Sequence, residues 1–428
     1  MAELERRPRE DDTVRIENVE VWDGERALGV GSVEWSVADG DGTITGVSVN
    51  ASASASGAAG VGTGASGDAG AGLAVIPGLI DTHVHLIGYA GRGHADFLSW
   101  PLTTRPEEQV LHGLAHAQAA LRGGVTTLRD LSADEIQFSL ARAVNSGLVE
   151  GPRLLAHGMV SMTAGHGDLF TPAAFPLRKP TADGPDECRK LVRQWARAGA
   201  DGIKIATSGG VLSVGDKASW RNHTRAEIDA IVDEAHALSM PVAAHAHTAE
   251  GIDIALDAGV DSIEHGTLIG EEQAARIAAS GVTVAPTLLI NDRIASGERA
   301  VSPEQSAKAA ELVSRRDALM RAAADAGVDF VLGTDANGHH VDFGDQMAEV
   351  RAMAGVFGWS ADRALQSATS RAAAAIGRGS SLGRLAPGYA ADLVVLRGRP
   401  WDDLGALDVS RIVAVVSRGR VVAGALPA

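Results

Sequence analysis

Short apolar runs alternate with Ala-rich helical segments along most of the chain, and no other feature of the sequence restricts the fold as strongly. The apolar runs lie at residues 75–80, 125–129, 153–156, 202–206, 241–244, 260–263, 282–285 and 328–333. Helical periodicity marks the segments 107–122, 186–198, 225–239, 249–258, 271–280 and 304–326. Strand–helix alternation repeated about eight times over roughly 250 residues is typical of a (β/α)8 barrel and fits an open sheet less well. We therefore predict an α/β fold of the TIM-barrel type.

Both ends of the chain have a different sequence pattern, in which short stretches alternate between apolar and polar residues. These stretches lie at 14–19, 43–47, 392–396, 412–416 and 419–422. They predict strands of a small, discontinuous β-sandwich domain that both chain ends build together.

The predicted domain boundaries follow from these changes in sequence pattern. We expect the N-terminal part of the β-sandwich at 1–74, the catalytic barrel at 75–382 and the C-terminal part of the β-sandwich at 383–428. Residues 51–72 contain almost nothing but Ala, Ser and Gly. Since such a tract has no side chains that can build a core, we predict a flexible insertion there.

Charge and composition exclude several classes of function. Lys and Arg number 38 against 54 Asp and Glu, which gives a net charge of −16, so nucleic acid and anionic membranes are poor partners. The chain has no run of 18 apolar residues, and its N-terminus lacks the apolar core of a signal peptide. We therefore expect a cytoplasmic protein that acts on a small molecule, and we also expect a homo-oligomer.

The single cysteine, Cys188, excludes an intrachain disulfide framework and any cysteine-rich zinc or iron–sulfur site. Metal chemistry in this chain must therefore use histidines and carboxylates.

The sharpest local signal is a pair of histidines, His83 and His85, at the end of the apolar segment 77–85. In a strand, residues i and i+2 point the same way. The two imidazoles therefore converge just past the first barrel strand, on the face where barrel active sites lie. A His-x-His pair on its own fits two surface histidines equally well.

Polar residues also lie at the carboxyl ends of several later strands, on the same face of the barrel. Lys204 lies among apolar residues of a strand that should be buried, where a lysine is costly unless it is paired or chemically altered. His245, His265 and Asp335 each close a further strand. Each residue alone has a structural explanation, such as a satisfied core histidine, a salt-bridged lysine or a strand-capping aspartate. Together with the first pair, they indicate a common site.

The order His-x-His, Lys, His, His, Asp on a barrel resembles the metal-dependent amidohydrolase superfamily. The segment Pro-Gly-Leu-Ile-Asp-Thr-His-Val-His at 77–85 and Gly-Thr-Asp-Ala at 333–336 carry the resemblance, and the ending at 383–396 is also typical of it. The segment 204–213, with the turn 165–168 before it, is similar to the branch of prolidase-like dipeptidases and imidazolonepropionase-related hydrolases. The resemblance covers nearly the whole chain.

The resemblance implies a site with two divalent metal ions, and zinc suits such ligands, although manganese and cobalt fit them too. It implies that Lys204 carries carbon dioxide as a carbamate that bridges both metals. His83, His85 and Asp335 would then hold the more buried ion, and His245 and His265 the more exposed one.

The expected chemistry is attack of a metal-activated hydroxide on an amide carbon. Asp335 would take the proton of the water and return it to the leaving nitrogen. His166 would stabilise the oxyanion, because its turn follows the third strand on the active-site face; the alternative is a turn histidine that faces solvent.

The segment after the fourth barrel strand is the candidate for substrate selection. The segment 214–225 concentrates positive charge in an acidic chain, and we predict that Lys217, Arg221 and His223 bind a substrate carboxylate. A solvated loop before the helix 225–239 fits them as well. Members of the resembling branch often have a tyrosine in this region, where this chain has none. His94, His247, His339 and His340 also lie near strand ends, but their spacing assigns them no role.

From the sequence we therefore predict a binuclear metal-dependent hydrolase of C–N bonds, either a dipeptidase or an N-acyl amino acid hydrolase. One alternative is a hydrolase of cyclic or neutral amides such as an imidazolone, a phenylurea or another N-aryl amide. Another is a barrel that binds a ligand without catalysis.

Overall fold

The computed structural model describes residues 13–37, 41–50, 72–88, 97–176 and 178–427. The chain divides into two compact units. The first consists of Met1–Ile80, Ala120–Thr126 and Ser360–Ala428, and the second of Asp81–Ala119 and Thr127–Trp359. The predicted flexible insertion falls almost entirely on residues 51–71, which lie outside the described part of the chain.

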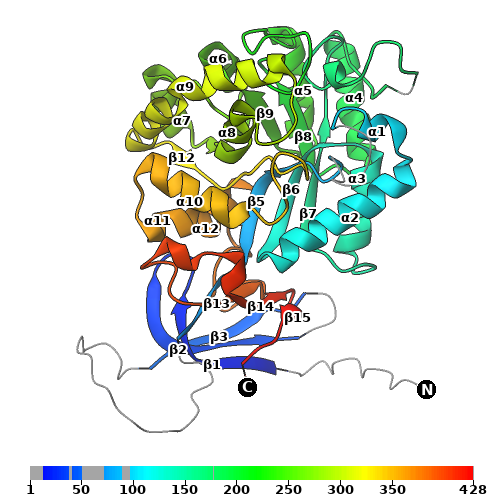
Figure 1. Cartoon of the computed structure of the whole chain (residues 1–428). Coiled ribbons are helices and arrows are strands. Elements are labelled where there is room, and N and C mark those ends of the chain that lie inside the picture. The colour runs from blue at the N-terminus through cyan, green and yellow to red at the C-terminus, as the bar shows by residue number, and fades with distance from the viewer. Residues whose placement is uncertain (1–12, 38–40, 51–71, 89–96, 177, 428) are drawn as a thin grey trace. The chain divides into compact units, whose positions relative to one another are not determined.

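The first unit contains one seven-stranded sheet in the order β15-β14-β13-β4-β1-β2-β3 (Figure 1). Its strands are β1 (Thr13–Trp22), β2 (Ala27–Ser36), β3 (Ile44–Val49), β4 (Leu73–Pro77), β13 (Leu393–Arg397), β14 (Ile412–Ser417) and β15 (Arg420–Gly424). Trp35 is fully buried in its core, and its indole N–H donates to the carbonyl of Gly419 at 3.0 Å. The two chain ends thus build one β domain, as the sequence predicts.

The second sheet is the eight-stranded parallel barrel that the strand–helix alternation predicts, in the order β12-β11-β10-β9-β8-β7-β6-β5. Its strands are β5 (Leu79–Val84), β6 (Val125–Ala133), β7 (Arg153–Met159), β8 (Gly202–Ala206), β9 (Val242–Ala246), β10 (Ser262–His265), β11 (Thr283–Ala285) and β12 (Asp329–Phe330). The residues after β12 close the barrel against β5, since Thr82 N–H donates to the Leu332 carbonyl at 2.9 Å and Asp335 N–H donates to the His83 carbonyl at 2.7 Å.

One strand differs from its prediction. The apolar run 75–80 was expected to be the first barrel strand, but the structure divides it at Gly78 into β4, in the sheet of the chain ends, and β5, in the barrel. A Cβ atom at Gly78 would lie 2.2 Å from Thr126 Oγ1, so the close approach requires glycine. Every residue of β4 and of β5 is buried, and hydropathy therefore does not show that the run serves two sheets.

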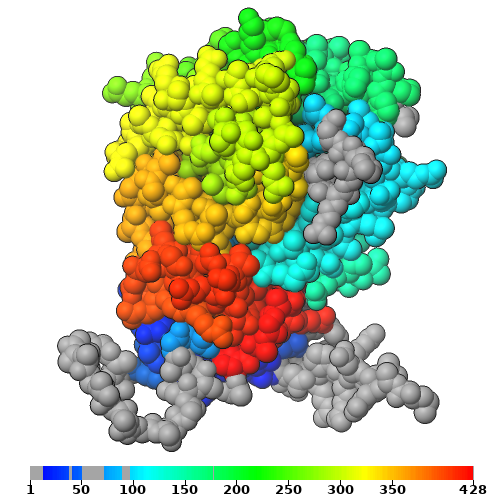
Figure 2. Space-filling view, in the orientation of Figure 1, coloured from blue at the N-terminus to red at the C-terminus, as the bar shows by residue number. Residues whose placement is uncertain are grey.

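Twelve α-helices lie in the described part of the chain. They are α1 (Trp100–Thr103), α2 (Pro106–Arg122), α3 (Glu135–Asn145), α4 (Pro185–Ala198), α5 (Arg225–Ala237), α6 (Ala249–Ala258), α7 (Glu271–Ser280), α8 (Leu288–Ser296), α9 (Pro303–Asp325), α10 (Gln346–Phe357), α11 (Ala361–Ser367) and α12 (Ser370–Ala375). Capping boxes at Asp134, Thr224 and Ser302 fix the starts of α3, α5 and α9. In the space-filling view, α7 and α9 cover part of the barrel unit on the side that faces the viewer (Figure 2). Among the described helices, none is long and apolar enough to cross a membrane.

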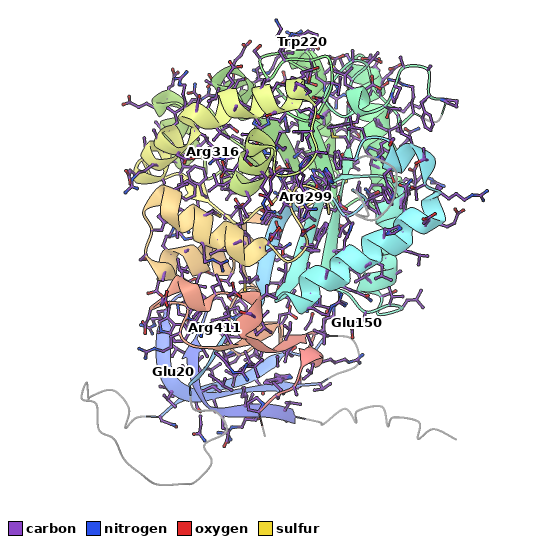
Figure 3. The ribbon with its side chains drawn as sticks, viewed as in Figure 1. Glu20, Glu150, Trp220, Arg299, Arg316 and Arg411 are labelled. Atoms are coloured by element: carbon purple, nitrogen blue, oxygen red, sulfur yellow. The ribbon has the colours of Figure 1, made fainter. Side chains whose placement is uncertain are left out.

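A buried carboxylate caps α8 from a different helix. Glu349 of α10 accepts the backbone N–H groups of Leu288 at 2.6 Å and Leu289 at 3.0 Å. Arg316 of α9, labelled in Figure 3, is also buried and donates to the Leu288 carbonyl at 3.1 Å. Burial raises the pKa of Glu349 to about 8, although both N–H groups and Arg316 oppose that rise.

This raised pKa predicts a pH-dependent stability. The folded protein binds the Glu349 proton more tightly than the unfolded chain, so this contribution is complete below about pH 4.5 and is lost as the pH rises through about 8. Between about pH 5.5 and about pH 9, the melting temperature of the wild type should fall by at least about 3 °C more than that of Glu349→Gln. Thermal unfolding followed by circular dichroism measures the difference. Glu311→Gln, at an exposed position of α9, is the control and should follow the wild type; equal slopes for all three proteins would contradict the prediction.

Candidate metal centre

A cavity of about 480 Å³ lies within the barrel unit, and the residues that end its strands line it. His83, Lys204, His245 and His265 line one part, together with Asp335. The remaining wall is largely apolar and includes Ile87, Leu98, Leu102, Ile136, Phe175 and Ile290. The structure thus brings together five of the predicted metal ligands, and the sixth, His85, lines the same cavity.

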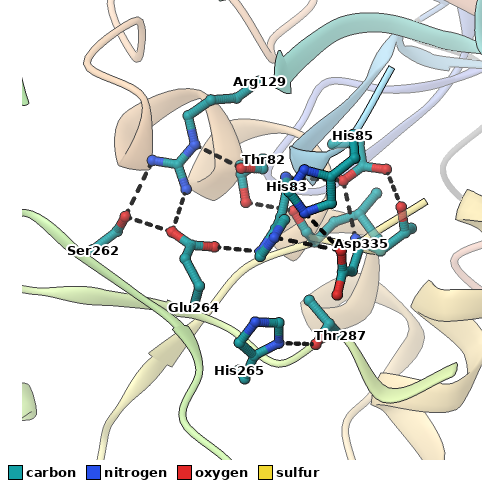
Figure 4. A network of polar contacts seen from close by, with 12 residues as sticks. Thr82, His83, His85, Arg129, Ser262, Glu264, His265, Thr287 and Asp335 are labelled. Atoms are coloured by element: carbon teal, nitrogen blue, oxygen red, sulfur yellow. Dashed lines mark hydrogen bonds and ion pairs between the residues drawn. The ribbon is translucent and has the colours of Figure 1, made fainter. Parts of the chain in front are cut away.

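His83 contacts one partner of a buried ion pair (Figure 4). Its Nδ1 lies 2.8 Å from Glu264 Oε2, and Arg129 Nη2 lies 2.7 Å from the other oxygen of the same carboxylate. Arg129 also donates to the Thr82 carbonyl at 2.6 Å. Burial would raise the pKa of Glu264, but Arg129 and His83 hold it well below its usual range. An ionised Glu264 places the His83 proton on Nδ1, and Nε2 is left with its lone pair free for a metal.

Asp335 lies close to both His83, in β5, and His85, the residue that follows β5. Its Oδ1 is 3.0 Å from His85 Nε2 and 3.7 Å from His83 Nε2. Burial would raise the pKa of Asp335, but His83, His85 and Lys204 lower it to about 2. This carboxylate is therefore ionised at neutral pH and can serve as a ligand or as a proton acceptor.

Asp81 fixes the backbone beneath this pair. It accepts the hydroxyl of Thr334 at 2.6 Å and the backbone N–H groups of Thr334 and His83, both at 3.1 Å. One buried side chain therefore ties the residue before Asp335 to the strand that carries His83.

A second group of possible ligands consists of His245, His247 and His265, whose ring nitrogens lie within 4.8 Å of one another. His265 also belongs to the first group, with His83 and Asp335. Sequence reasoning gave His247 no role. The i, i+2 spacing that singled out His83 and His85 also relates His245 to His247, and that signal could have found it.

The hydrogen-bond partner of His245 sets which nitrogen it can offer. Its Nε2 lies 3.2 Å from the carbonyl of Gly209, which can only accept, so Nε2 carries the proton and Nδ1 is free. Burial lowers the pKa of His245 well below its usual value and that of His83 to about 4. Both rings are therefore neutral at physiological pH, the form that binds metals.

Lys204 is 4 % exposed in β8, and its Nζ has no hydrogen-bond partner among the described residues. Burial lowers its pKa to about 8, so a substantial fraction of the amine is neutral near physiological pH. Buried polar groups normally have a hydrogen-bond partner, so a buried amine without one indicates a group that binds or reacts there. The site thus offers imidazoles with free lone pairs, an ionised carboxylate and a buried amine. These donors fit the predicted pair of metal ions.

The predicted position of His166 near the centre is also found. Its ring stacks on that of His245, with centroids 4.1 Å apart, and a Cβ atom at position 210 would lie 2.2 Å from His166 Cε1, so only Gly210 allows this packing. His166 Nδ1 is 3.2 Å from Ser213 Oγ, which donates its own proton to Asp216 at 2.8 Å. Nδ1 must therefore be the donor, and the neutral ring presents Nε2 as an acceptor. Stabilising an oxyanion through Nε2 would require the imidazolium.

The predicted carboxylate-binding loop does not join this cluster. Lys217 and Arg221 are exposed, His223 is buried, and none of the three is among the residues that line the cavity. Trp220 of the same loop is 46 % exposed on the surface (Figure 3). The cavity-lining cations away from the histidines are Arg178 and Lys179, which sequence reasoning missed because nothing in the spacing sets them apart.

Of the histidines without a predicted role, His339 and His340 pack against each other, with ring centroids 4.5 Å apart. His94 lies outside the described residues.

Comparisons with known proteins agree with this geometry. Residues 74–424 match the family model described as "Amidohydrolase family". Ochratoxinase from Aspergillus niger is 32 % identical over 366 residues, which cover 81 % of this chain and 74 % of that protein. Imidazolonepropionase from Cereibacter sphaeroides is 28 % identical over 351 residues, which cover 76 % of this chain and 80 % of that protein. The crystal structure of a Xaa-Pro dipeptidase with bound methionine superposes with a TM-score of 0.82 at 30 % identity, covering 96 % of this chain and 99 % of that one.

The buried ion pair beneath His83 predicts a large effect on stability. Glu264→Gln leaves Arg129 buried beside a neutral group, and the free energy of unfolding of the metal-free protein should fall by about 3–5 kcal/mol. Replacing both partners by apolar residues, as in Arg129→Met with Glu264→Leu, should cost less than Glu264→Gln alone. Urea unfolding measures both. Asp229→Asn, which breaks the exposed pair with Arg225, is the control and should cost at most about 1 kcal/mol. A similar small loss for Glu264→Gln would show that the pair does not support the barrel.

Proposed function

The chain belongs to the amidohydrolase family, and on that premise we propose a binuclear metal-dependent hydrolase that cleaves the amide bond of a dipeptide or an N-acyl amino acid with a free carboxylate. One observation carries the proposal. Two overlapping groups of ligands share His265, and they line a largely apolar cavity together with a buried lysine amine that has no hydrogen-bond partner among the described residues.

His83, His85 and Asp335 would hold one divalent cation, and His245 and His265 the other. His247 is a further possible ligand of the second ion, because its ring nitrogen belongs to the same group of three. Zinc suits these imidazole and carboxylate donors. When bound, two such cations lower the pKa of a water molecule and polarise the carbonyl of the amide.

Lys204 would bridge the two ions as a carbamate. The neutral amine adds through Nζ to the carbon of carbon dioxide and releases one proton, which gives an anion with two oxygen donors. The support for this step is the position of Nζ, which is buried among the ligands and has no described partner.

Asp335 would accept the proton of the attacking water and return it to the leaving nitrogen. Its carboxylate is ionised and its side chain is 14 % exposed, so it can reach a substrate in the cavity. His166 would accept a hydrogen bond through Nε2 while its ring is neutral, because its proton is on Nδ1, which donates to Ser213 Oγ.

The cavity indicates the kind of substrate. A volume of about 480 Å³ with largely apolar walls suits a bulky apolar side chain or acyl group. The similarity to a Xaa-Pro dipeptidase supports an amide substrate with an amino acid part. The similarity to imidazolonepropionase favours one alternative, a cyclic or neutral amide.

A panel of substrates tests the proposal. The protein is expressed with added zinc, and its rates are measured on dipeptides and N-acyl amino acids, with cyclic amides and phenylureas as the contrasting set. We expect the free acids to have the larger kcat/KM. Faster turnover of the cyclic or neutral amides would establish the alternative. No turnover of any member, together with less than one metal per chain, would indicate a binding protein.

Removal of the proposed bridge should affect metal binding directly. Lys204→Ala should lose most of the bound metal, measured by elemental analysis, because both ions lose a shared anionic ligand. Its activity should fall by more than about 100-fold. Lys190→Ala is the control, since it removes a lysine at an exposed position of α4 outside the ligand groups; it should retain its metal. Full metal content in Lys204→Ala would show that the carbamate is wrong.

A further inference from the structure

Among the described residues that line the cavity, three are lysines or arginines. Lys204 lies at the ligand groups, and the other two are Arg178 and Lys179, in the segment between β7 and α4. A carboxylate that enters this largely apolar cavity needs a cationic partner, because an unpaired buried charge is costly. Apart from the proposed metal ions, whose role is in the cleavage itself, the choice is therefore between these two side chains.

The structure holds the guanidinium of Arg178 in place. Its Nη2 forms an ion pair with Asp168, and its Nη1 donates to the carbonyl of Pro172 at 3.3 Å. The Asp168 side chain is only 5 % exposed, and its second oxygen accepts the backbone N–H of Ala164 at 2.9 Å. A guanidinium has five N–H donors in a planar fork, so these two contacts leave donors for a ligand. The Arg178 side chain is 31 % exposed, which keeps it accessible.

The same segment connects Arg178 to the metal centre. His166, which stacks on His245, is two residues from Asp168 in the sequence, so their Cα atoms are at most about 7 Å apart. Phe170 and Phe175 from this segment also line the cavity. One segment therefore supplies an imidazole beside the ligand groups, an apolar surface and an arginine.

Lys179 is the weaker candidate. Its Nζ lies 3.0 Å from Asp134 Oδ2, and its side chain is 55 % exposed. A lysine acts as a solvated point charge, whereas the planar fork of an arginine can keep one carboxylate on one edge and receive a second on another.

We propose that Arg178, oriented by Asp168, recognises the carboxylate of the substrate and thereby selects N-acyl amino acids and dipeptides with apolar groups. The inference rests on the proposed function and adds the residue that determines specificity. It differs from the sequence-based prediction, which gave this role to the loop 214–225.

The experiment compares N-acyl-phenylalanine with its C-terminal carboxamide, which offers the same scissile bond without the charge. For the metal-loaded enzyme, kcat/KM is measured on both substrates in the wild type, Arg178→Met and Arg221→Met. We expect Arg178→Met to lower kcat/KM for the acid by about 10–100-fold, mainly through KM, with at most about a threefold change for the carboxamide and unchanged metal content. Arg193→Met is the matched control, because Arg193 is an exposed arginine that pairs with Glu234 outside the cavity lining; it should behave as the wild type.

A second variant distinguishes the loss of substrate recognition from a loss of folding. Arg178→Met leaves Asp168 buried without its partner, so the double variant Arg178→Met with Asp168→Asn removes both charges and should show the same loss of preference for the acid. If both variants keep the wild-type preference, or if Arg221→Met loses it instead, the role of Arg178 is refuted. Equal rates of the wild type on acid and carboxamide would also refute it while amide hydrolysis stands. Cleavage of neither substrate, nor of any other amide in the panel, would refute the proposed function itself.

Discussion

The buried ion pair between Arg129 and Glu264 is the interaction on which the barrel interior depends. The carboxylate of Glu264 contacts His83, and the guanidinium of Arg129 donates to the carbonyl of Thr82 and to Ser262. Three strands, β5, β6 and β10, thus meet at one charged network beneath the ligands. Two charges in a barrel core are costly unless each donor and acceptor is used. Here the same buried carboxylate, Glu264, also orients the ring of His83 and keeps its proton on Nδ1.

Backbone strain is concentrated at the same end of the barrel. His265, Thr287 and Asp335 have φ angles of 71°, 48° and 57°, in the left-handed region that residues with a side chain rarely adopt. His265 Nδ1 lies 2.7 Å from Thr287 Oγ1, so two of these residues hold each other, while the N–H of Asp335 donates to His83. Such conformations persist where the surroundings fix them. Of the three side chains, those of His265 and Asp335 line the cavity.

The sequence predicts the parts that follow from periodicity and from strand ends. Because i and i+2 share a face and active sites lie at the carboxyl ends of barrel strands, His83, His85, Lys204, His245, His265 and Asp335 can be named before the structure is known. The division of the run 75–80 between two sheets could not be predicted, since all of its residues are apolar and buried. Arg178 could not be predicted either, because a long segment without periodicity carries it, and only the fold places Asp168 against it.

Closure of the barrel has a consequence for biosynthesis. The hydroxyl of Thr334 donates to Asp81, and the two residues are 253 positions apart in the chain. His83 is made early in synthesis, with the first barrel strand, while Asp335 is added only after all eight barrel strands. Until Asp335 has been added, His83 and His85 therefore lack this carboxylate partner. Binding of both ions in the arrangement proposed here therefore requires a chain that has been made through Asp335, since this residue completes the ligand set.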